Sequence, residues 1–173
     1  MSRAVRLWGF VTALVVLLLD QGVKWAVTGP LQLDYDGAIK PILPIFNLRF
    51  VANIGVSLGL LQASSAASRW ALVALTAVIA IGVTVWMLRE KKLADVIALG
   101  LVLGGALGNI LDRVRLGYVV DYADLHFGAW RPFLVFNLGD AAITIGVLVL
   151  LGRALLVRDK PKASRASVEN INA

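Results

Sequence analysis

The chain has 173 residues, of which 59% are apolar, and its mean hydropathy is +0.81. Soluble domains are about 45–50% apolar, so this composition indicates a membrane protein. With no cysteine and one histidine, a disulfide framework, thiolate chemistry and a zinc site built from several histidines are excluded. The net charge of +6 does not indicate nucleic-acid binding, because the basic residues flank apolar runs and form no solvated basic face.

Four apolar runs are long enough to cross a bilayer, which takes about 20 residues. We expect helices over about 7–27, 70–88, 93–112 and 134–157. The first run has the basic start of a signal peptide, with Arg3 and Arg6, but no small-residue cleavage site follows near Asp20. We therefore expect this run to be retained as a membrane helix.

Lysines and arginines predict the direction of the spans, because cytoplasmic ends carry more of them. Ten of the seventeen lie on one set of helix ends: Arg3, Arg6, Arg89, Lys91, Lys92, Arg153, Arg158, Lys160, Lys162 and Arg165. Both termini are therefore predicted to be cytoplasmic. Tryptophans fall near the span ends, as an aromatic belt requires: Trp8, Trp25, Trp70, Trp86 and Trp130.

The two outward segments are about 28–69 and 113–133. In the first, PIFNLRFVANIGVSLGLL (44–61) mixes β-branched and aromatic residues with Pro and Gly, which predicts short strands and turns. QASSAASRW (62–70) is compatible with a short surface helix. In the second, GYVVDYADLH (117–126) predicts a short extended piece. The polar tail after Arg158 is expected to be disordered, which leaves 1–158 as one membrane domain and 159–173 as a cytoplasmic tail.

Acidic residues gather at one predicted depth. Asp20 lies about 20 Å along the first helix, counted from Leu7. Asp112 lies at the outer end of the third helix, Asp140 one or two turns into the fourth, and Asp121 in the loop between them. Charged groups in a bilayer are costly, so these carboxylates are functional candidates near the outer surface.

Structural alternatives apply to two of these acids. Asp20 and Lys24 are four residues apart on a helix and form a natural ion pair near its end. Asp112 stands beside Arg113 and is open to the same interpretation, as an ordinary interfacial pair.

Two further acids are interpreted differently. Asp124, close to His126, is expected to be a solvated loop acid. Asp140 follows Asn137 by one helical turn within an apolar run. A lone carboxylate there requires a partner, a proton or a function, which favours a functional role.

Five motifs in order resemble the bacterial lipoprotein signal peptidases, also called signal peptidase II. They are DQGVKW (20–25), NIGVSLG (53–59), GGALGNILDR (104–113), GYVVDY (117–122) and FNLGDAAI (136–143). The resemblance extends over nearly the whole chain up to about residue 157. It departs at Gly139, where the family usually has Ala, and at Leu58, where it often has Phe.

The resemblance implies an all-α membrane protein of four transmembrane helices with a small extracytoplasmic β-cradle and a short surface helix. It implies an aspartic endopeptidase of the bacterial inner membrane that cuts a prolipoprotein before its diacylglyceryl-modified cysteine, with no cofactor or metal. The implied catalytic pair is Asp121 and Asp140. Residues implied to support the site or the substrate are Asp20, Lys24, Asn53, Gly55, Gly108, Asn109, Asp112, Arg113 and Asn137. The expected partners are the substrate and the bilayer, and we expect a monomer.

The chemistry suits these residue types. Two close carboxylates cannot both ionise cheaply, so they share a proton and together activate a water. Either aspartate is compatible with the role of base. Asn109 and Asn137 can hold the carboxylates or the substrate backbone, because an amide both donates and accepts. Glycines 104, 105 and 108 favour close approach, either of two helices or of a helix and the substrate.

Three rival functions remain at this point. GVSLG (55–59) matches the nucleophile elbow of serine hydrolases, and Asp121 and His126 follow it in order, but four spans leave no room for the large sheet that this motif requires. A proton-relay transporter would place its acids near the midplane. A non-enzymatic scaffold would tolerate Asn at both Asp121 and Asp140.

Overall fold

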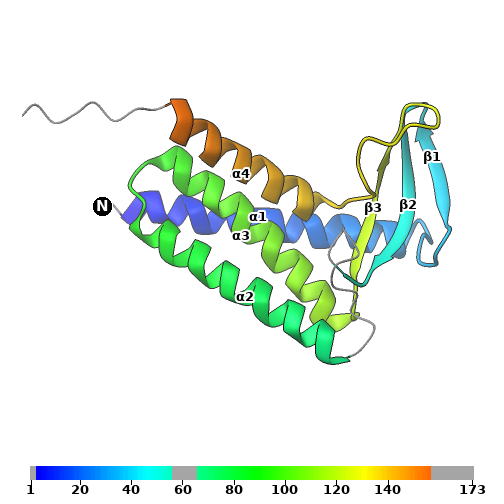
Figure 1. Ribbon diagram of the computed structural model, residues 1–173, viewed down its shortest axis with the longest axis horizontal. Coiled ribbons are helices and arrows are strands. Elements are labelled where there is room, and N and C mark those ends of the chain that lie inside the picture. The colour runs from blue at the N-terminus through cyan, green and yellow to red at the C-terminus, as the bar shows by residue number, and fades with distance from the viewer. Residues whose placement is uncertain (1–2, 56–65, 157–173) are drawn as a thin grey trace, which may run out of the picture.

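The computed structural model describes residues 3–55 and 66–156. The helices are α1 (Arg3–Thr28), α2 (Ala66–Arg89), α3 (Leu93–Arg115) and α4 (Leu138–Leu156), and the strands are β1 (Ile39–Leu43), β2 (Phe46–Asn53) and β3 (Val119–Leu125). Figure 1 shows the helices as an elongated bundle with the strands at one end. The start of α1 and the end of α4 both lie at the other end of the bundle.

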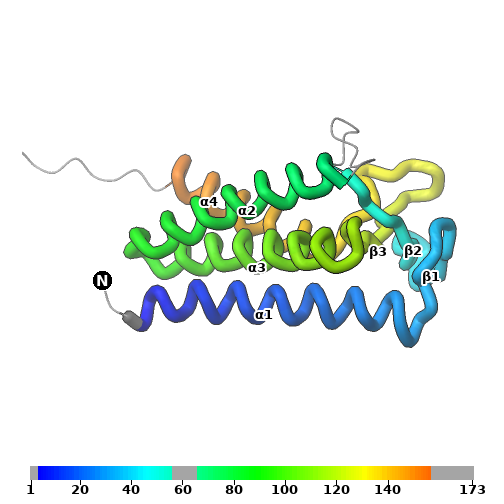
Figure 2. The backbone as a smooth tube through the Cα atoms, turned by 90° about the horizontal axis from the view of Figure 1, so that it is seen from below, coloured from blue at the N-terminus to red at the C-terminus, as the bar shows by residue number. Residues whose placement is uncertain are grey.

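Helix α3 is the centre of the bundle. It packs extensively against α1 and α4 and also contacts α2, whereas α1 and α2 barely touch, as Figure 2 shows. A Cβ atom on Gly104 would lie 2.5 Å from the carbonyl oxygen of Ala13 in α1, and one on Gly105 would collide with the carbonyl oxygen of Gly139 in α4. These two glycines therefore serve close helix packing, one of the two alternatives that the sequence left open.

The outer surface of the bundle is apolar. Leu18 of α1, Ile81 of α2 and Leu155 of α4 are 63%, 64% and 71% exposed. All four helices are long and apolar enough to cross a membrane. Water-soluble proteins rarely expose a continuous apolar surface of this kind, whereas lipid chains cover it without cost. The predicted membrane protein of four helices and a small sheet is thus confirmed.

The three strands form an antiparallel sheet in the order β1-β2-β3. Val51 of β2 lies opposite Asp121 of β3. Phe50 and Val120 are buried in one apolar cluster with Val27, near the end of α1. This cluster attaches the sheet to the bundle and so positions β3 beside the ends of α1 and α3. The extended structure predicted within 44–61 and 117–126 is confirmed for the part of the chain that the structure describes.

The predicted start of the fourth helix is wrong, because α4 begins at Leu138 and not at 134. Phe136 forms a bridge with Ala123 of β3, in which each N–H donates to the other residue's carbonyl oxygen, at 2.7 and 3.1 Å. A residue paired with a strand in this way cannot also begin a helix. Asp140 therefore lies in the first turn of α4, nearer the helix end than expected.

Three other predictions concern the edges of the described chain or its sheet. Of the surface helix expected over 62–70, residues 62–65 lie outside the described residues and the remainder belongs to α2; the tail 159–173 also lies outside them. The expectation of a solvated Asp124 is wrong. This residue is 1% exposed, and its Oδ1 lies 3.1 Å from Nε of Arg131. It is buried because β3 continues to Leu125 and carries Asp124 into the sheet.

Candidate active site

Asp121 lies on β3 with 2% of its surface exposed. Asn53, the last residue of β2, donates from Nδ2 to its Oδ2 at 2.9 Å. Asn137, just before α4, donates from Nδ2 to its Oδ1 at 2.6 Å. Because each carboxylate oxygen accepts a hydrogen bond from a different element, the orientation of this carboxyl group is fixed.

Asp140 and Asn137 cap the start of α4 reciprocally. The N–H of Asp140 donates to Oδ1 of Asn137 at 2.9 Å, and the N–H of Asn137 donates to Oδ2 of Asp140 at 3.3 Å. Asn109 of α3 donates from Nδ2 to the other oxygen of Asp140 at 2.8 Å. Asn137 therefore contacts both Asp121 and Asp140, which brings the two carboxylates to one place.

The two carboxylates interact electrostatically. Burial, followed by the charge of Asp140, raises the pKa of Asp121 to about 7, and the hydrogen bonds from Asn53 and Asn137 oppose this rise. The raised pKa means that Asp121 retains its proton into the neutral range.

The pH dependence of stability should report this raised pKa. Asp121 has a pKa of 3.8 as the reference value and about 7 in the fold, so its proton leaves the unfolded chain first as the pH rises. The stability contributed by the protonated group is complete below about pH 4 and is lost as the pH rises to about 7. Asp121→Asn cannot ionise, so its Tm relative to wild type should increase over this range. A Tm difference that stays constant from pH 4 to 7 in detergent would contradict the raised pKa.

Lys24 joins the acids of α1 and α3. It is 4% exposed, and its Nζ lies 2.7 Å from Oδ2 of Asp20 and 2.8 Å from Oδ2 of Asp112. The same Nζ donates to Oδ1 of Asn109 at 3.1 Å. Because the oxygen of this amide faces the ammonium group, its NH₂ group faces Asp140. Nδ2 of Asn137 donates to the same oxygen at 3.2 Å, so Lys24 and Asn137 together determine which side of Asn109 contacts that carboxylate.

The two acids that pair with Lys24 also accept hydrogen bonds from backbone N–H groups. Oδ1 of Asp20 accepts from the N–H of Gly139 at 2.9 Å, and Oδ2 of Asp112 accepts from the N–H of Val120 at 3.1 Å. Gly139 and Val120 each directly precede one of the two carboxylates of the pair. The predicted ion pair of Asp20 and Lys24 is confirmed, and through the N–H of Gly139 it also contacts the first turn of α4, next to Asp140.

Arg113 does not form the alternative pair with its neighbour Asp112, which faces Lys24. Its Nη2 donates to the carbonyl oxygen of Gly55 at 3.3 Å. The N–H of Gly55 in turn donates to Oδ1 of Asn53 at 3.1 Å. These contacts orient the side chain of Asn53, which in turn donates to the carboxylate of Asp121.

Asp140 borders an open groove of about 650 Å³, between segment 132–136 and α4. This carboxylate is only partly buried and is accessible from the groove. Within 3–55 and 66–156, no three His, Asp or Glu side chains are grouped so that they would hold a metal ion. The arrangement presents two carboxylates, their amide donors and an approach for a substrate, which suits acid–base hydrolysis.

The sequence profile of signal peptidase (SPase) II matches residues 12–156. The chain belongs to the signal peptidase II family. It is 58% identical to a lipoprotein signal peptidase of Rhizorhabdus wittichii over 163 residues, which cover 94% of each chain. It is 54% identical to one from Sphingopyxis alaskensis over 153 residues, or 88% of each chain. The protein is therefore an enzyme with lipoprotein signal peptidase function, and the transporter and scaffold interpretations are rejected.

Two solved structures, both described as bacterial membrane enzymes studied by the in meso method, share this fold. One has a TM-score of 0.74 at 24% identity and covers 90% of this chain and 94% of its own. The other has a TM-score of 0.72 at 28% identity and covers 87% and 94%. The signal peptidase II chain thus has the fold of known bacterial membrane enzymes over most of its length.

Two glycines leave room around Asp20. A Cβ atom on Gly108 would collide with its carboxylate, and one on Gly139 would lie 3.2 Å from its Oδ1 and 3.0 Å from the carbonyl oxygen of Gly105. At Gly139, where the signal peptidase II family usually has Ala, a methyl group would be tightly enclosed. The second departure, Leu58, lies outside the described residues.

The structure brings all the predicted site residues to the sheet end of the bundle. Those joined by the contacts above are Asp20, Lys24, Asn53, Gly55, Asn109, Asp112, Arg113, Asp121, Asn137 and Asp140. The eleventh, Gly108, accepts through its carbonyl oxygen from Nε2 of Gln21 at 3.3 Å.

Two supporting residues were not predicted. Gln21 also donates to Oδ1 of Asp112 at 2.9 Å, and its place inside the DQGVKW motif was a usable signal. The hydroxyl of Tyr122 accepts from the N–H of Leu138 at 3.1 Å, and so holds the first residue of α4 against β3. No sequence signal indicates this second contact, because it depends on how a strand and a distant helix meet.

Proposed function

We propose that this enzyme is an aspartic endopeptidase that cuts a prolipoprotein immediately before its diacylglyceryl-modified cysteine, with Asp121 and Asp140 activating the water. The observation that carries the proposal is the bridge through Asn137, whose side chain and backbone contact both carboxylates. Asn53 and Asn109 hold the outer sides of the same pair. A helix cap at Asn137 requires only one of these carboxylates. Capping alone therefore does not explain why the same asparagine also holds the second.

In the proposed reaction, the ionised carboxylate removes a proton from water while the water oxygen bonds to the scissile carbonyl carbon. The protonated carboxyl group donates its proton to the carbonyl oxygen, and a tetrahedral diol results. Proton transfer to the amide nitrogen then allows the C–N bond to break, which releases the signal peptide with a new carboxyl terminus and the lipoprotein with a free amino group. The raised pKa of Asp121 favours that residue as the initial proton donor.

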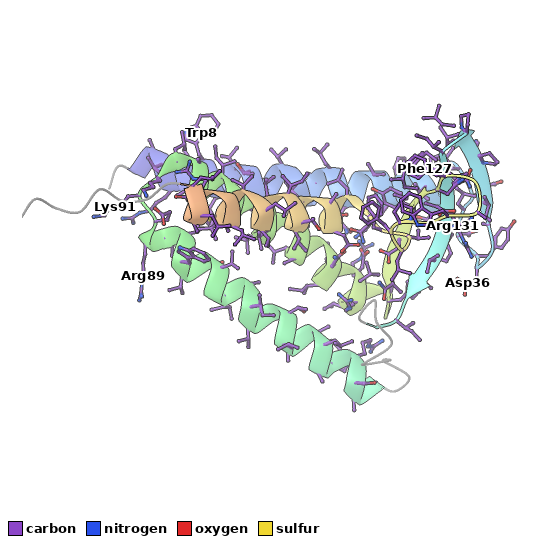
Figure 3. All side chains as sticks on the ribbon, turned by 45° about the horizontal axis from the view of Figure 1, so that its top comes forward. Trp8, Asp36, Arg89, Lys91, Phe127 and Arg131 are labelled. Carbon is purple, nitrogen blue, oxygen red and sulfur yellow. The ribbon has the colours of Figure 1, made fainter. Side chains whose placement is uncertain are left out.

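We further propose that both termini and the α2–α3 loop face the cytoplasm of a bacterial inner membrane, with the sheet outside. Figure 3 shows Arg89 and Lys91 at the end of the bundle opposite Asp36, Phe127 and Arg131. Basic residues favour the cytoplasmic side. The two acids then lie near the outer surface, where the lipid chains of the substrate remain in the bilayer while the scissile bond reaches water. Residues 1–158 would act as one monomeric membrane domain, with 159–173 as its cytoplasmic tail.

The proposed substrate class is tested with the purified enzyme and one prolipoprotein prepared with and without the diacylglyceryl group. Mass spectrometry should show a single cut before the modified cysteine and at most slow cleavage of the unmodified form. Equal cleavage of both forms, or a cut elsewhere, would overturn the proposed specificity.

The serine hydrolase alternative gives an opposite expectation for two residues. Ser57 lies outside the described residues, and the backbone N–H of His126 donates to the carbonyl oxygen of Ile45 at 2.9 Å, in the sheet. If two aspartates activate the water, Ser57→Ala and His126→Ala should each keep kcat within about threefold of wild type, because neither side chain takes part. A loss of a hundredfold or more in both variants would restore the serine mechanism.

A further inference from the structure

A second groove, the α1–α2 groove, lies between these two helices on the surface of α3, and none of the carboxylates of the candidate active site borders it. Its volume is about 460 Å³. The buried side chains of Ala13, Ala80 and Leu103 lie at its base. The exposed side chains of Phe10 and Ile81 lie at its sides. The groove is therefore apolar and open to the surface that faces lipid.

The α1–α2 groove exists because the two helices meet closely near one end only. At that end a Cβ atom on Gly9 would lie 2.5 Å from Sδ of Met87, so α1 and α2 are in contact there. From this contact α2 diverges from α1 toward the sheet, as Figures 1 and 2 show. Both helices pack against α3, which closes the space on one side. The bilayer is then left to fill the other side.

Two arginines lie at the end where α1 and α2 meet. Arg6 is exposed and lies one helical turn before Phe10, on the same face of α1. Arg6 precedes Gly9 by three residues, and the exposed Arg89 follows Met87 by two. Because Gly9 and Met87 are in contact and the helices run in opposite directions, the two arginines lie at about the same level.

Neither arginine has a carboxylate partner among the residues that the structure describes. The described acids at this end are engaged elsewhere. Asp95 pairs with Arg153, and Oε1 of Glu90 accepts from the N–H groups of Lys91 and Lys92 at 2.8 and 3.0 Å. An anionic lipid headgroup would supply the missing negative charge, because basic residues at the membrane surface attract such lipids.

We infer that the α1–α2 groove holds an acyl chain of an anionic phospholipid whose phosphate group contacts Arg6 and Arg89. This lipid is a resident of the site and not the substrate. The site follows from the groove and the two cations alone. Its assignment to the inner leaflet rests on the orientation proposed above.

The length of the groove matches one leaflet. Leu17 is the last residue of α1 that lines it, and it lies about 16 Å further along the helix than Arg6. The hydrocarbon core of a bilayer is about 30 Å thick, so one leaflet supplies about half of that. A chain that begins at a headgroup beside Arg6 therefore ends near the bilayer centre, where the groove ends.

A helix of a second copy of the chain fits the groove less well. The lining residues Phe10 to Leu17 extend over two helical turns of α1. A helix with side chains is about 10 Å across and rises about 5.4 Å per turn, so two turns fill about 850 Å³. The groove has about half this volume.

An extended peptide would leave its N–H and C=O groups without partners in the groove. The hydroxyl of Thr84, the polar group in the lining, already donates to the carbonyl oxygen of Ala80 at 2.8 Å. An acyl chain requires no hydrogen-bond partner and therefore matches this lining.

Selectivity at this site should come from the headgroup. Lipid tails are as apolar as leucine, so a chain gains little by moving from the bilayer into the groove. A basic residue near an anionic lipid contributes about 1 kcal/mol, which corresponds to about fivefold in affinity. The site should therefore distinguish lipids by charge when their chains are the same.

The test measures lipid binding to the full-length enzyme in detergent by native mass spectrometry, with dioleoyl phosphatidylglycerol and dioleoyl phosphatidylcholine as probes. Wild type should bind the anionic lipid at least tenfold more tightly, because two arginines contribute. Arg6→Gln should weaken binding of the anionic lipid about fivefold and leave the zwitterionic lipid unchanged. Lys40→Gln removes the same charge from β1 and should change neither. Equal binding of both lipids by wild type, or an unchanged anionic affinity in Arg6→Gln, would overturn the inference.

A second pair of variants tests the position of the chain. Thr84→Phe places a ring in the groove, and Val78→Phe places the same ring at an exposed position of α2 that does not line it. Thr84→Phe should weaken binding of both lipids about fivefold or more, and Val78→Phe should weaken neither. Equal effects of the two variants would overturn the assignment to the groove. A dimer mass in lipid-free wild type that disappears in Thr84→Phe would assign the groove to a second copy instead.

The lipid site and the proposed function fail separately. Lipid binding is measured without substrate, so its absence leaves the proposed peptidase reaction untouched. Absence of prolipoprotein cleavage would overturn the proposed function and would leave the lipid affinities of wild type and Arg6→Gln as they are.

Discussion

Asp121→Asn and Asp140→Asn should each lower kcat for prolipoprotein cleavage by about a thousandfold. Asparagine keeps the size of the side chain but can neither accept the proton from water nor return it to the substrate, and loss of general acid–base catalysis costs about 10² to 10⁴ in rate. KM should change little, because the groove beside Asp140 and the backbone contacts remain. Cleavage is followed by mass spectrometry with enzyme in excess, so that slow turnover is still measured.

Asp124→Asn is the matched control for both variants. Asp124 shares β3 with Asp121, is equally buried and forms an ion pair with Arg131. Its removal changes a buried carboxylate of the same sheet outside the proposed pair, so kcat should stay within about threefold of wild type. Undiminished cleavage by a folded Asp121→Asn or Asp140→Asn variant would remove that residue from the mechanism. A thousandfold loss in Asp124→Asn would show that the sheet, and not the pair, determines activity.

Lys24→Met should lower the free energy of unfolding by about 3–5 kcal/mol, the cost of removing one partner from a buried ion pair. Asp20 and Asp112 both lose their cation at a place where water does not compensate them. The amide of Asn109 also loses one of the two contacts that orient it and keeps only the one from Asn137, so the residual folded protein should cleave at least tenfold more slowly. Unfolding in detergent, followed by tryptophan fluorescence, measures the first effect.

Two further variants test whether the lost stability comes from the uncompensated buried carboxylates or from the loss of any lysine. Lys40→Met removes an exposed lysine of β1 and should change stability by less than about 0.5 kcal/mol. Asp112→Asn, added to Lys24→Met, removes one of the two uncompensated carboxylates and should recover part of the stability. If Lys24→Met is as stable as wild type, the ion pairs with Asp20 and Asp112 do not support the site.

The fold followed from features that act locally along the chain. Span length and apolar composition predict four helices, because a bilayer sets both. The end of the fourth helix toward the sheet was misplaced because its apolar residues continue through Phe136, which a distant strand pairs through Ala123. Composition does not distinguish an apolar residue in a helix from one in a bridge.

The sequence also indicated that the acids of different helices lie close together, and the reason is similar. Helix rise and span order place Asp20, Asp112 and Asp140 at one level, so their meeting follows from the topology. Asp124 was misjudged, since its neighbour His126 and the short segment suggested a loop, whereas β3 runs on past it. Which amide faces which carboxylate, as for Asn109, depends on contacts between four elements and has no signal in the sequence.

The pH dependence of kcat/KM, measured from about pH 4 to 9 for wild type and for His126→Ala, tests the shared-proton pair most directly. Activity requires one ionised and one protonated carboxyl group, so the rate should fall at low pH, where both are protonated, and at high pH, where both are ionised. The alkaline limb should lie near the pKa of Asp121, at about 7, and should be the same in both proteins. A rate that rises with pH and stays level to pH 9, or an alkaline limb that disappears in His126→Ala, would contradict catalysis by this aspartate pair.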